Sequence, residues 1–222
     1  MPTHFEFFQD RGVYSFPVFS IPYHELPFVT CIMPTANRVQ YMLTAIKYFL
    51  NQDYPYKELV IVDNGLECSS TIIPTLYSLR YFYLSQPATI GLKRNIACEK
   101  AAGHIIVHWD DDDWYASNWI SHQVNVLLKT EADICGLNHV KFYSENDKRY
   151  YFTKNTFARQ NWLCSATLGY RKSFWMKYPF RDIQVGEGDF FVRNRKAKVF
   201  AHDYYKGFIA RVHSSNVRIR EY

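Results

Sequence analysis

A chain of 222 residues, with 48% hydrophobic residues and only 9 glycines and 9 prolines, fits one α/β domain and is too apolar for a disordered protein. The net charge of +5 is uneven, because residues 171–222 carry 12 basic and 5 acidic side chains whereas residues 1–170 carry 14 and 16. The basic last third would attract phosphates, an anionic acceptor or an anionic membrane surface. No nucleic-acid-binding motif appears, so nucleic acid is not an expected partner.

The cysteines indicate a reducing compartment. There are five, an odd number, widely spaced and without a CxxC pair: Cys31, Cys68, Cys98, Cys135 and Cys164. No basic segment is followed by an apolar run at the N-terminus, and no apolar stretch approaches the roughly 18 residues that span a bilayer. We therefore expect a cytoplasmic protein, at most peripheral to the inner face of the membrane.

The chain divides into an arm and one domain. Residues 1–27 are aromatic-rich and aperiodic and contain Pro17, Pro22 and Pro27, so we expect an extended arm. Residues 28–222 are expected to form a single domain. Its first half would cover residues 28–130 and its second half residues 131–222, including the basic tail.

The first half alternates short apolar segments with helical periodicity. Strands are predicted at residues 28–33, 58–62, 80–84 and 104–109, and helices at residues 38–51, 69–78 and 92–102. This alternation predicts an α/β fold with a mostly parallel central sheet that is flanked by helices on both faces.

The second half predicts a smaller mixed region. Strands are expected at residues 133–143 and 166–170, a turn at 144–147, and short helices at 174–178 and 187–195. No internal repeat or low-complexity segment interrupts it.

Four consecutive aspartates, Asp110 to Asp113, directly follow the apolar strand at 104–109. Like charges at the end of a buried strand repel one another, and hard carboxylate oxygens favour Mg²⁺ or Mn²⁺, ions that often bind substrate phosphates. We interpret the run as a metal–diphosphate site. The alternative is an acidic loop in which Asp113 caps a helix that begins near Ser117.

Two other polar loops follow predicted strands. They are Pro34-Thr35-Ala36-Asn37 and Asp63-Asn64-Gly65. Because ligands of parallel sheets bind beyond the carboxyl ends of the strands, we expect both loops to converge with the aspartates.

Five segments, in the same order along the chain, together resemble the inverting family 2 of the GT-A glycosyltransferases. They are residues 31–38 (CIMPTANR), 51–55 (NQDYP), 59–65 (LVIVDNG), 91–95 (GLKRN) and 108–115 (HWDDDDWY). The resemblance extends over about residues 28–195. It implies a GT-A (Rossmann-like) fold, a nucleotide-sugar donor that is most often a UDP-sugar, Mn²⁺ or Mg²⁺, and a saccharide or glycolipid acceptor bound by the second half.

The resemblance assigns donor-binding residues. The family's Asp-Asp-Gly-Ser loop is Asp63-Asn64-Gly65-Leu66 here, so an amide carbonyl of Asn64 would accept the uracil N–H in place of a carboxylate. The full set of implied donor-binding residues is Pro34, Thr35, Asn37, Arg38, Asp63, Asn64, Lys93, Arg94, Asp110 and Asp111.

The resemblance also implies metal ligands. The family's Asp-x-Asp signature fits Asp110 and Asp112, and by register also Asp111 and Asp113. Asp112 is the expected metal ligand and Asp110 would contact ribose or metal. The resemblance also offers His213 as an additional ligand, since several GT-A enzymes supply a late histidine. A packed or surface histidine is the alternative.

The catalytic base is expected in the segment Val185-Gly186-Glu187-Gly188-Asp189. It resembles the family's Glu-Asp motif, but Gly188 stands where the base would fall. A one-residue shift makes Asp189 the base, and another alignment makes it Glu187. A helix N-terminus whose dipole these acids complement is the structural alternative.

Two other functions compete with an inverting, metal-assisted sugar transfer. The split Glu-Gly-Asp would suit a catalytically weak nucleotide- or sugar-binding module on the same fold. A nucleotidyltransferase would instead require a Gly-rich phosphate loop after the first strand, which residues 34–37 do not supply.

Overall fold

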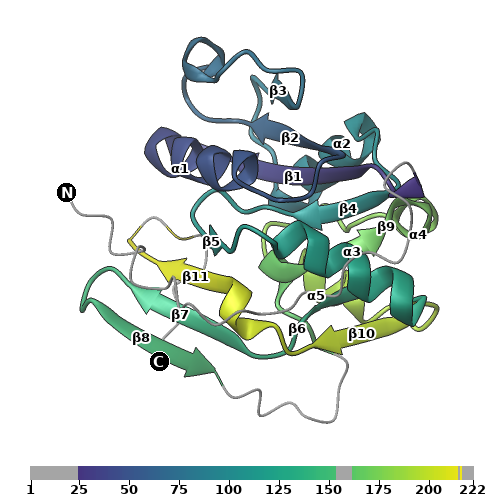
Figure 1. The fold of residues 1–222 in the computed structure, drawn as a ribbon. Coiled ribbons are helices and arrows are strands. Elements are labelled where there is room, and N and C mark those ends of the chain that lie inside the picture. Colours follow the sequence, from purple (N-terminus) through teal and green to yellow (C-terminus); the bar gives the residue numbers. More distant parts are fainter. Residues whose placement is uncertain (1–24, 154–161, 215, 217–222) are drawn as a thin grey trace.

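The computed structural model describes residues 25–153, 162–214 and 216, so the expected arm lies almost wholly outside the described residues. The strands of the main sheet are β1 (Val29–Thr35), β2 (Lys57–Asp63), β3 (Leu79–Tyr83), β4 (Ile105–His108), β6 (Ile134–Leu137), β9 (Gly169–Arg171) and β10 (Val199–His202). They pair in the order β10-β6-β9-β4-β1-β2-β3 (Figure 1), and only β9 runs antiparallel to its neighbours. The predicted mostly parallel α/β sheet is confirmed.

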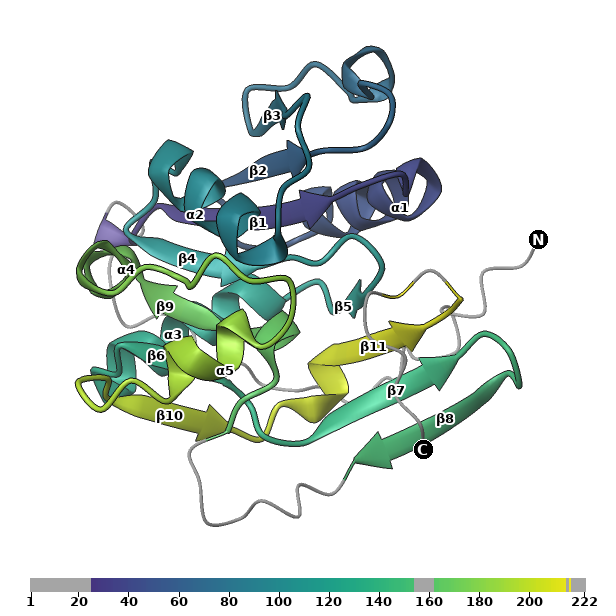
Figure 2. The same ribbon diagram turned by 180° about the vertical axis from the view of Figure 1, so that it is seen from behind.

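Helices cover both faces of this sheet. On one face lie α1 (Val39–Leu50) and α3 (Trp119–Thr130); on the other lie α2 (Ile90–Lys100), α4 (Lys172–Lys177) and α5 (Glu187–Val192), which Figure 2 shows in front. Successive strand residues point to opposite faces, so Cys31 and Met33 pack with α1 and α3 while Ile32 packs with α2 and α5. Burial on both faces explains why β1 and β2 are apolar without alternation.

A second, four-stranded sheet lies beside the carboxyl end of the first. Its strands are β5 (Trp114–Tyr115), β11 (Phe208–Val212), β7 (Val140–Ser144) and β8 (Arg149–Thr153), paired in that order. β11 runs antiparallel to β5, which directly follows the aspartates. This pairing brings the end of the described chain back to the aspartate run.

Several predicted elements differ from the structure. The expected helix at 69–78 is only a 3₁₀ turn at Ser70–Ile72, because Pro74 cannot donate a helical hydrogen bond and restricts Ile73 to an extended conformation. The expected strand at 133–143 is two strands, β6 and β7, which belong to different sheets. The expected strand at 166–170 is a 3₁₀ turn at Ser165–Thr167 followed by β9.

The proposed cap at Asp113 is also wrong. Helix α3 begins at Trp119 with Asn118 at its N-cap, and Asp113 precedes β5 instead. The helix expected at 187–195 ends at Val192. Strands β5, β8, β10 and β11 were not expected from the sequence.

No helix among the described residues is both long and apolar enough to cross a membrane.

Candidate functional site

The aspartate run is anchored by two aromatic side chains. Trp109, fully buried, donates from Nε1 to the Ala45 carbonyl of α1 at 3.0 Å and stacks on Tyr115 with ring centroids 3.9 Å apart. The Tyr115 hydroxyl accepts the backbone N–H of Asp110 at 2.7 Å. Trp109 is therefore a packing residue, and the turn that presents the carboxylates is fixed at both ends.

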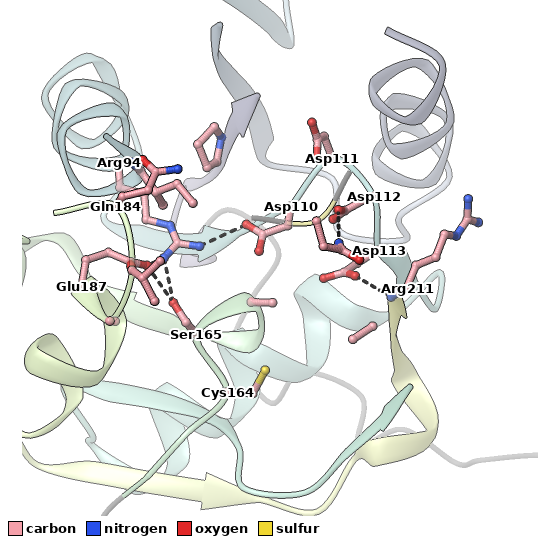
Figure 3. A pocket seen from close by; sticks show the side chains of 18 of the residues that line it. Arg94, Asp110, Asp111, Asp112, Asp113, Cys164, Ser165, Gln184, Glu187 and Arg211 are labelled. Carbon is pink, nitrogen blue, oxygen red and sulfur yellow. Dashed lines mark hydrogen bonds and ion pairs between the residues drawn. The ribbon is translucent and has the colours of Figure 1, made fainter. Parts of the chain in front are cut away.

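Each aspartate points in a different direction. The Asp110 carboxylate accepts from Arg94 at 3.1 Å on the α2 side, and Asp111 accepts from the Thr35 hydroxyl at 2.5 Å. Asp113 accepts the backbone N–H of Arg211 in β11 at 2.9 Å. Figure 3 shows the side chains of the four aspartates, Asp110 to Asp113, pointing in different directions.

Asp112 has the most crowded carboxylate. Its Oδ2 accepts from Arg38 Nη1 at 2.6 Å, and His213 Nε2 and Asn216 Nδ2 each lie 3.0 Å away. The His213 ring stacks on Tyr41 of α1, with centroids 4.4 Å apart and planes 14° apart. The structure thus brings His213 to Asp112, as the sequence prediction required.

Burial disfavours the charged form of the carboxyl groups in this cluster. It raises the pKa of Asp110, of Asp111 to about 7, and of Asp113 well above its usual range, and the neighbouring carboxylates raise all three further. Arg94 and Arg38 oppose these shifts at Asp110 and Asp111. The cluster is therefore a strong site for positive charge.

A cleft of about 240 Å³ opens over the aspartates. Five of the expected donor-binding residues line it: Pro34, Arg38, Arg94, Asp110 and Asp111. Asp112, Glu187 and Asp189 line it too, together with Trp162. The two expected aspartate ligands and both candidate bases therefore face a common space, and His213 contacts Asp112 without lining the cleft.

The remaining donor-binding candidates form a hydrogen-bonded layer behind the cleft. Lys93 Nζ donates to the Thr35 carbonyl at 3.0 Å and to Asn64 Oδ1 at 2.8 Å, and burial lowers its pKa to about 8. The Asp63 carboxylate accepts from Gly65 N and the Tyr81 hydroxyl at 2.7 and 2.8 Å.

Asn37 completes this layer from the first loop. It has a left-handed backbone (φ 56°), and its side chain accepts the Leu66 N–H at 2.7 Å. The loops after β1 and β2 therefore converge, as predicted.

The opposite wall of the cleft is built around Arg94. This guanidinium, with a side chain only 3% exposed, donates to Asp110, to Ser165 Oγ at 2.7 Å and to Glu187 (Figure 3). Glu187 opens α5 and is itself buried. Its carboxylate is held in this network, with the Ser165 hydroxyl also donating to it at 3.2 Å.

The geometry explains the glycine between the two candidate bases. A Cβ at Gly188 would lie 2.2 Å from Ser165 Oγ, so no side chain fits there. Asp189, one position later, is partly buried and lines the cleft, and among the described residues no side chain pairs with its carboxylate. Both acids reach the cleft, but only Glu187 is bound in an ion pair.

The chemistry of Asp112 and His213 fits a divalent cation. Two ligand atoms in adjacent positions of an octahedral ion, with bonds of about 2.1 Å, lie about 3.0 Å apart, which matches the observed 3.0 Å between Asp112 Oδ2 and His213 Nε2. Within the described ranges, no group of three or more His, Cys, Asp or Glu side chains is placed so that it could hold a metal ion by itself. Two protein ligands would leave the other coordination positions of such an ion to phosphate and water oxygens.

Sequence reasoning missed Ser165 and Asn216. Ser165 joins Arg94 to Glu187, and Asn216 donates to Asp112 while accepting the His213 N–H at 2.6 Å. No motif marks either residue. Only the closeness of Asn216 to the predicted ligand His213 could have suggested it.

Comparison with known proteins finds a matching family model and similar curated proteins. The family model described as glycosyl transferase family 2 matches residues 30–199. An uncharacterized glycosyltransferase of Haemophilus influenzae is 29% identical over 142 residues, 58% of this chain and 57% of that protein. The putative colanic acid biosynthesis glycosyl transferase WcaA of Escherichia coli is 35% identical over 128 residues, 54% of this chain and 43% of that protein. The chain thus spans about half the length of these relatives.

Solved structures share the fold. Staphylococcus aureus TarS 1–349 in complex with UDP superposes with a TM-score of 0.65 at 19% identity, covering 83% of this chain and 60% of that one. The mannosyltransferase PcManGT from Pyrobaculum calidifontis, in complex with GDP-Man and Mn²⁺, gives 0.64 at 16% identity, covering 89% and 60%. At this level of identity the likeness shows that this chain and the two solved structures share a fold.

Proposed function

The chain belongs to glycosyl transferase family 2 and has the GT-A fold, and from this premise we propose that it transfers a sugar from a nucleotide-sugar to an acceptor hydroxyl with inversion at the anomeric carbon. The observation that carries the proposal is the placement of two separate acidic sites on one cleft, the aspartate run and the start of α5. An inverting transfer requires this arrangement, because the leaving diphosphate and the attacking hydroxyl lie on opposite faces of the sugar.

The donor would lie along the aspartate side. Pro34, Thr35, Asn37, Asp63, Asn64 and Lys93 would hold the nucleoside, and Arg38, Arg94, Asp110 and Asp111 the ribose and diphosphate. Asn64 Oδ1 accepts one hydrogen bond from Lys93 and keeps a second lone pair, which supports acceptance of a uracil N–H and hence a UDP-sugar. TarS has UDP bound, whereas PcManGT has GDP-Man bound. The nucleobase of the donor is therefore to be determined by experiment.

Asp189 is proposed as the general base. Its carboxylate lines the cleft without a described partner, so it can accept the proton of the acceptor hydroxyl. Glu187 is the second candidate, but its ion pair with Arg94 suits a structural role better. Mn²⁺ or Mg²⁺ bound by Asp112 and His213, with Asp110 nearby, would supply positive charge to the departing diphosphate.

The acceptor is proposed to be a saccharide or glycolipid. Arg193, Arg195, Lys196 and Lys198 are exposed between α5 and β10, at the amino ends of β6 and β10 and away from the cleft, which supports contact with an anionic membrane surface. Cosedimentation with phosphatidylglycerol vesicles, compared with phosphatidylcholine vesicles, tests the membrane contact; equal binding to both would contradict it.

Calorimetric titration tests the donor site. We expect UDP to bind in the presence of Mn²⁺ and to bind at least about tenfold more weakly without it, whereas Asp112→Asn abolishes this metal dependence. GDP and CDP serve as the competing nucleotides. Binding of none of the three would remove the proposed function, and metal-dependent binding without any transfer or donor hydrolysis would leave a binding module.

A further inference from the structure

Arg38 occupies the position from which a cation would be held. A single nitrogen, Nη1, donates to Asp111 Oδ1 at 3.0 Å and to Asp112 Oδ2 at 2.6 Å. The residue stands at the N-cap of α1 but makes no side-chain cap, so the guanidinium is wholly directed to the aspartates. The acidic run is thereby partly neutralised by the protein's own side chain.

The three nitrogen atoms around Asp112 Oδ2 do not respond alike to a bound metal. His213 can exchange an N–H for a metal bond, and the amide of Asn216 is neutral. Arg38 is always charged and has no lone pair to offer, so it would repel a cation on the same oxygen at close range. Arg38 is therefore the group that must leave when a divalent ion binds Asp112.

The surroundings of Arg38 permit that movement. Its side chain is 17% exposed and lines both the cleft and a neighbouring hollow of about 600 Å³ between the start of α1 and residues 66–72. Arg94, by contrast, is 3% exposed and is tied to Glu187 and Ser165 as well as Asp110. Of these two arginines on the aspartate run, only Arg38 has open space on its far side.

We propose that Arg38 makes metal binding conditional on the nucleotide. Without a donor, its guanidinium occupies Asp111 and Asp112 and weakens divalent-cation binding. A diphosphate entering the cleft offers the guanidinium a bidentate anionic partner, and the released carboxylate oxygen becomes available to the ion. This inference rests on the proposed donor site and adds that one residue couples the two ligands.

The coupling has a definite sign. Arg38→Gln should bind Mn²⁺ at least about tenfold more tightly than the unchanged protein when no nucleotide is present, although a basic residue has been lost from a site for anions. UDP should then increase Mn²⁺ affinity by a correspondingly smaller factor. Because linkage is reciprocal, Mn²⁺ should also strengthen UDP binding less in this variant.

The experiment is a titration of Mn²⁺ alone, and of Mn²⁺ with saturating UDP, followed by calorimetry and by the electron paramagnetic resonance signal of free Mn²⁺. Arg38→Lys keeps the charge and should retain weak metal binding without UDP. Arg80→Gln removes a 38%-exposed arginine that pairs with Glu58 and should behave as the unchanged protein. Thermal melts establish that each variant is folded.

Two results would overturn the inference and identify the reason. If Asp112→Asn abolishes Mn²⁺ binding but Arg38→Gln binds Mn²⁺ no more tightly than the unchanged protein without UDP, the site stands and Arg38 does not compete for it. If no variant binds Mn²⁺ or UDP under any condition, the proposed function fails and the coupling fails with it.

Discussion

Two arginine side chains contact the same aspartate run from different walls of the cleft, and the two walls differ in how far they enclose the guanidinium. On the α2 and α5 side, Arg94 is sealed between Asp110, Glu187 and Ser165, and its side chain is 3% exposed. On the α1 side, Arg38 meets Asp111 and Asp112 at 17% exposure, beside open space. The same ion-pair chemistry therefore gives a fixed wall, in which the guanidinium is enclosed, and an exchangeable edge, at which the guanidinium borders open space.

The largest expected effect is a loss of turnover, and it tests the two acids on the Arg94 side of the cleft, Asp189 and Glu187. Asp189→Asn should lower kcat by about 10²–10⁴-fold, because the acceptor loses its base, while UDP affinity stays within about twofold. Glu187→Gln should act mainly on folding. A donor-and-acceptor assay, paired with UDP titration, measures both; turnover retained in Asp189→Asn but lost in a stable Glu187→Gln protein would make Glu187 the base.

The second effect compares the two arginines directly. Arg94→Gln leaves the carboxylates of Asp110 and Glu187 without their buried partner and should lower the free energy of unfolding by about 3–5 kcal/mol. Arg38→Gln should lower it by less than Arg94→Gln does, because the Arg38 side chain is 17% exposed and Asp112 keeps its hydrogen bond from Asn216. Urea unfolding at neutral pH measures both, with Arg80→Gln as the surface control. Equal losses for the two variants would mean that the walls do not differ.

Two histidines, His122 and His202, should make the free energy of unfolding depend on pH, so the unfolding measurements on the arginine variants are made at neutral pH. Burial lowers the pKa of His122 to about 4 and of His202 to about 3, and their rings lie 4.7 Å apart between α3 and β10, outside both walls. The unfolded chain takes up these protons below a pKa of about 6.5 and the folded chain does not, so stability falls as pH drops from about 6.5 toward 4 and 3.

At pH 5 each of these histidines should lower the free energy of unfolding by roughly 2 kcal/mol relative to pH 7.5. Urea unfolding at the two pH values measures the loss, and His122→Gln should remove its share of the pH dependence. A loss in His122→Gln as large as in the unchanged protein would assign the acid sensitivity to other groups.

Strands β1, β2 and β4 and the loops after them could be predicted, because the apolar runs and polar loops that mark them are local features of the sequence. The apolar runs of β1, β2 and β4 end in polar loops, and parallel pairing sends those loops to one edge, where the structure has them. Strands β10 and β11 could not be predicted, because each is four or five residues long and pairs in parallel with β6 or β7, far back in the chain. Their pairing is set by tertiary packing.

In the site, the residue types were predictable but their partners were not. The Asp110-x-Asp112 spacing and His213 were visible in the sequence. The bond from Arg38 to Asp112 joins residues 74 positions apart, and the bond from Arg94 to Glu187 joins residues 93 apart. Nothing local distinguishes an arginine that will pair with a carboxylate from one that will contact a phosphate, since both are recognised by the same guanidinium.

The return of β11 to the aspartates also orders events during synthesis. The contacts of Asp113 with Arg211, and of Asp112 with His213 and Asn216, span 98 to 104 residues, whereas Arg38 precedes Asp112 in the chain. At about 5–20 residues per second, a ribosome completes the aspartates roughly 5–20 s before it reaches His213. Throughout that interval the growing chain already contains Arg38 but not His213, so of these two partners of Asp112 only the arginine is available.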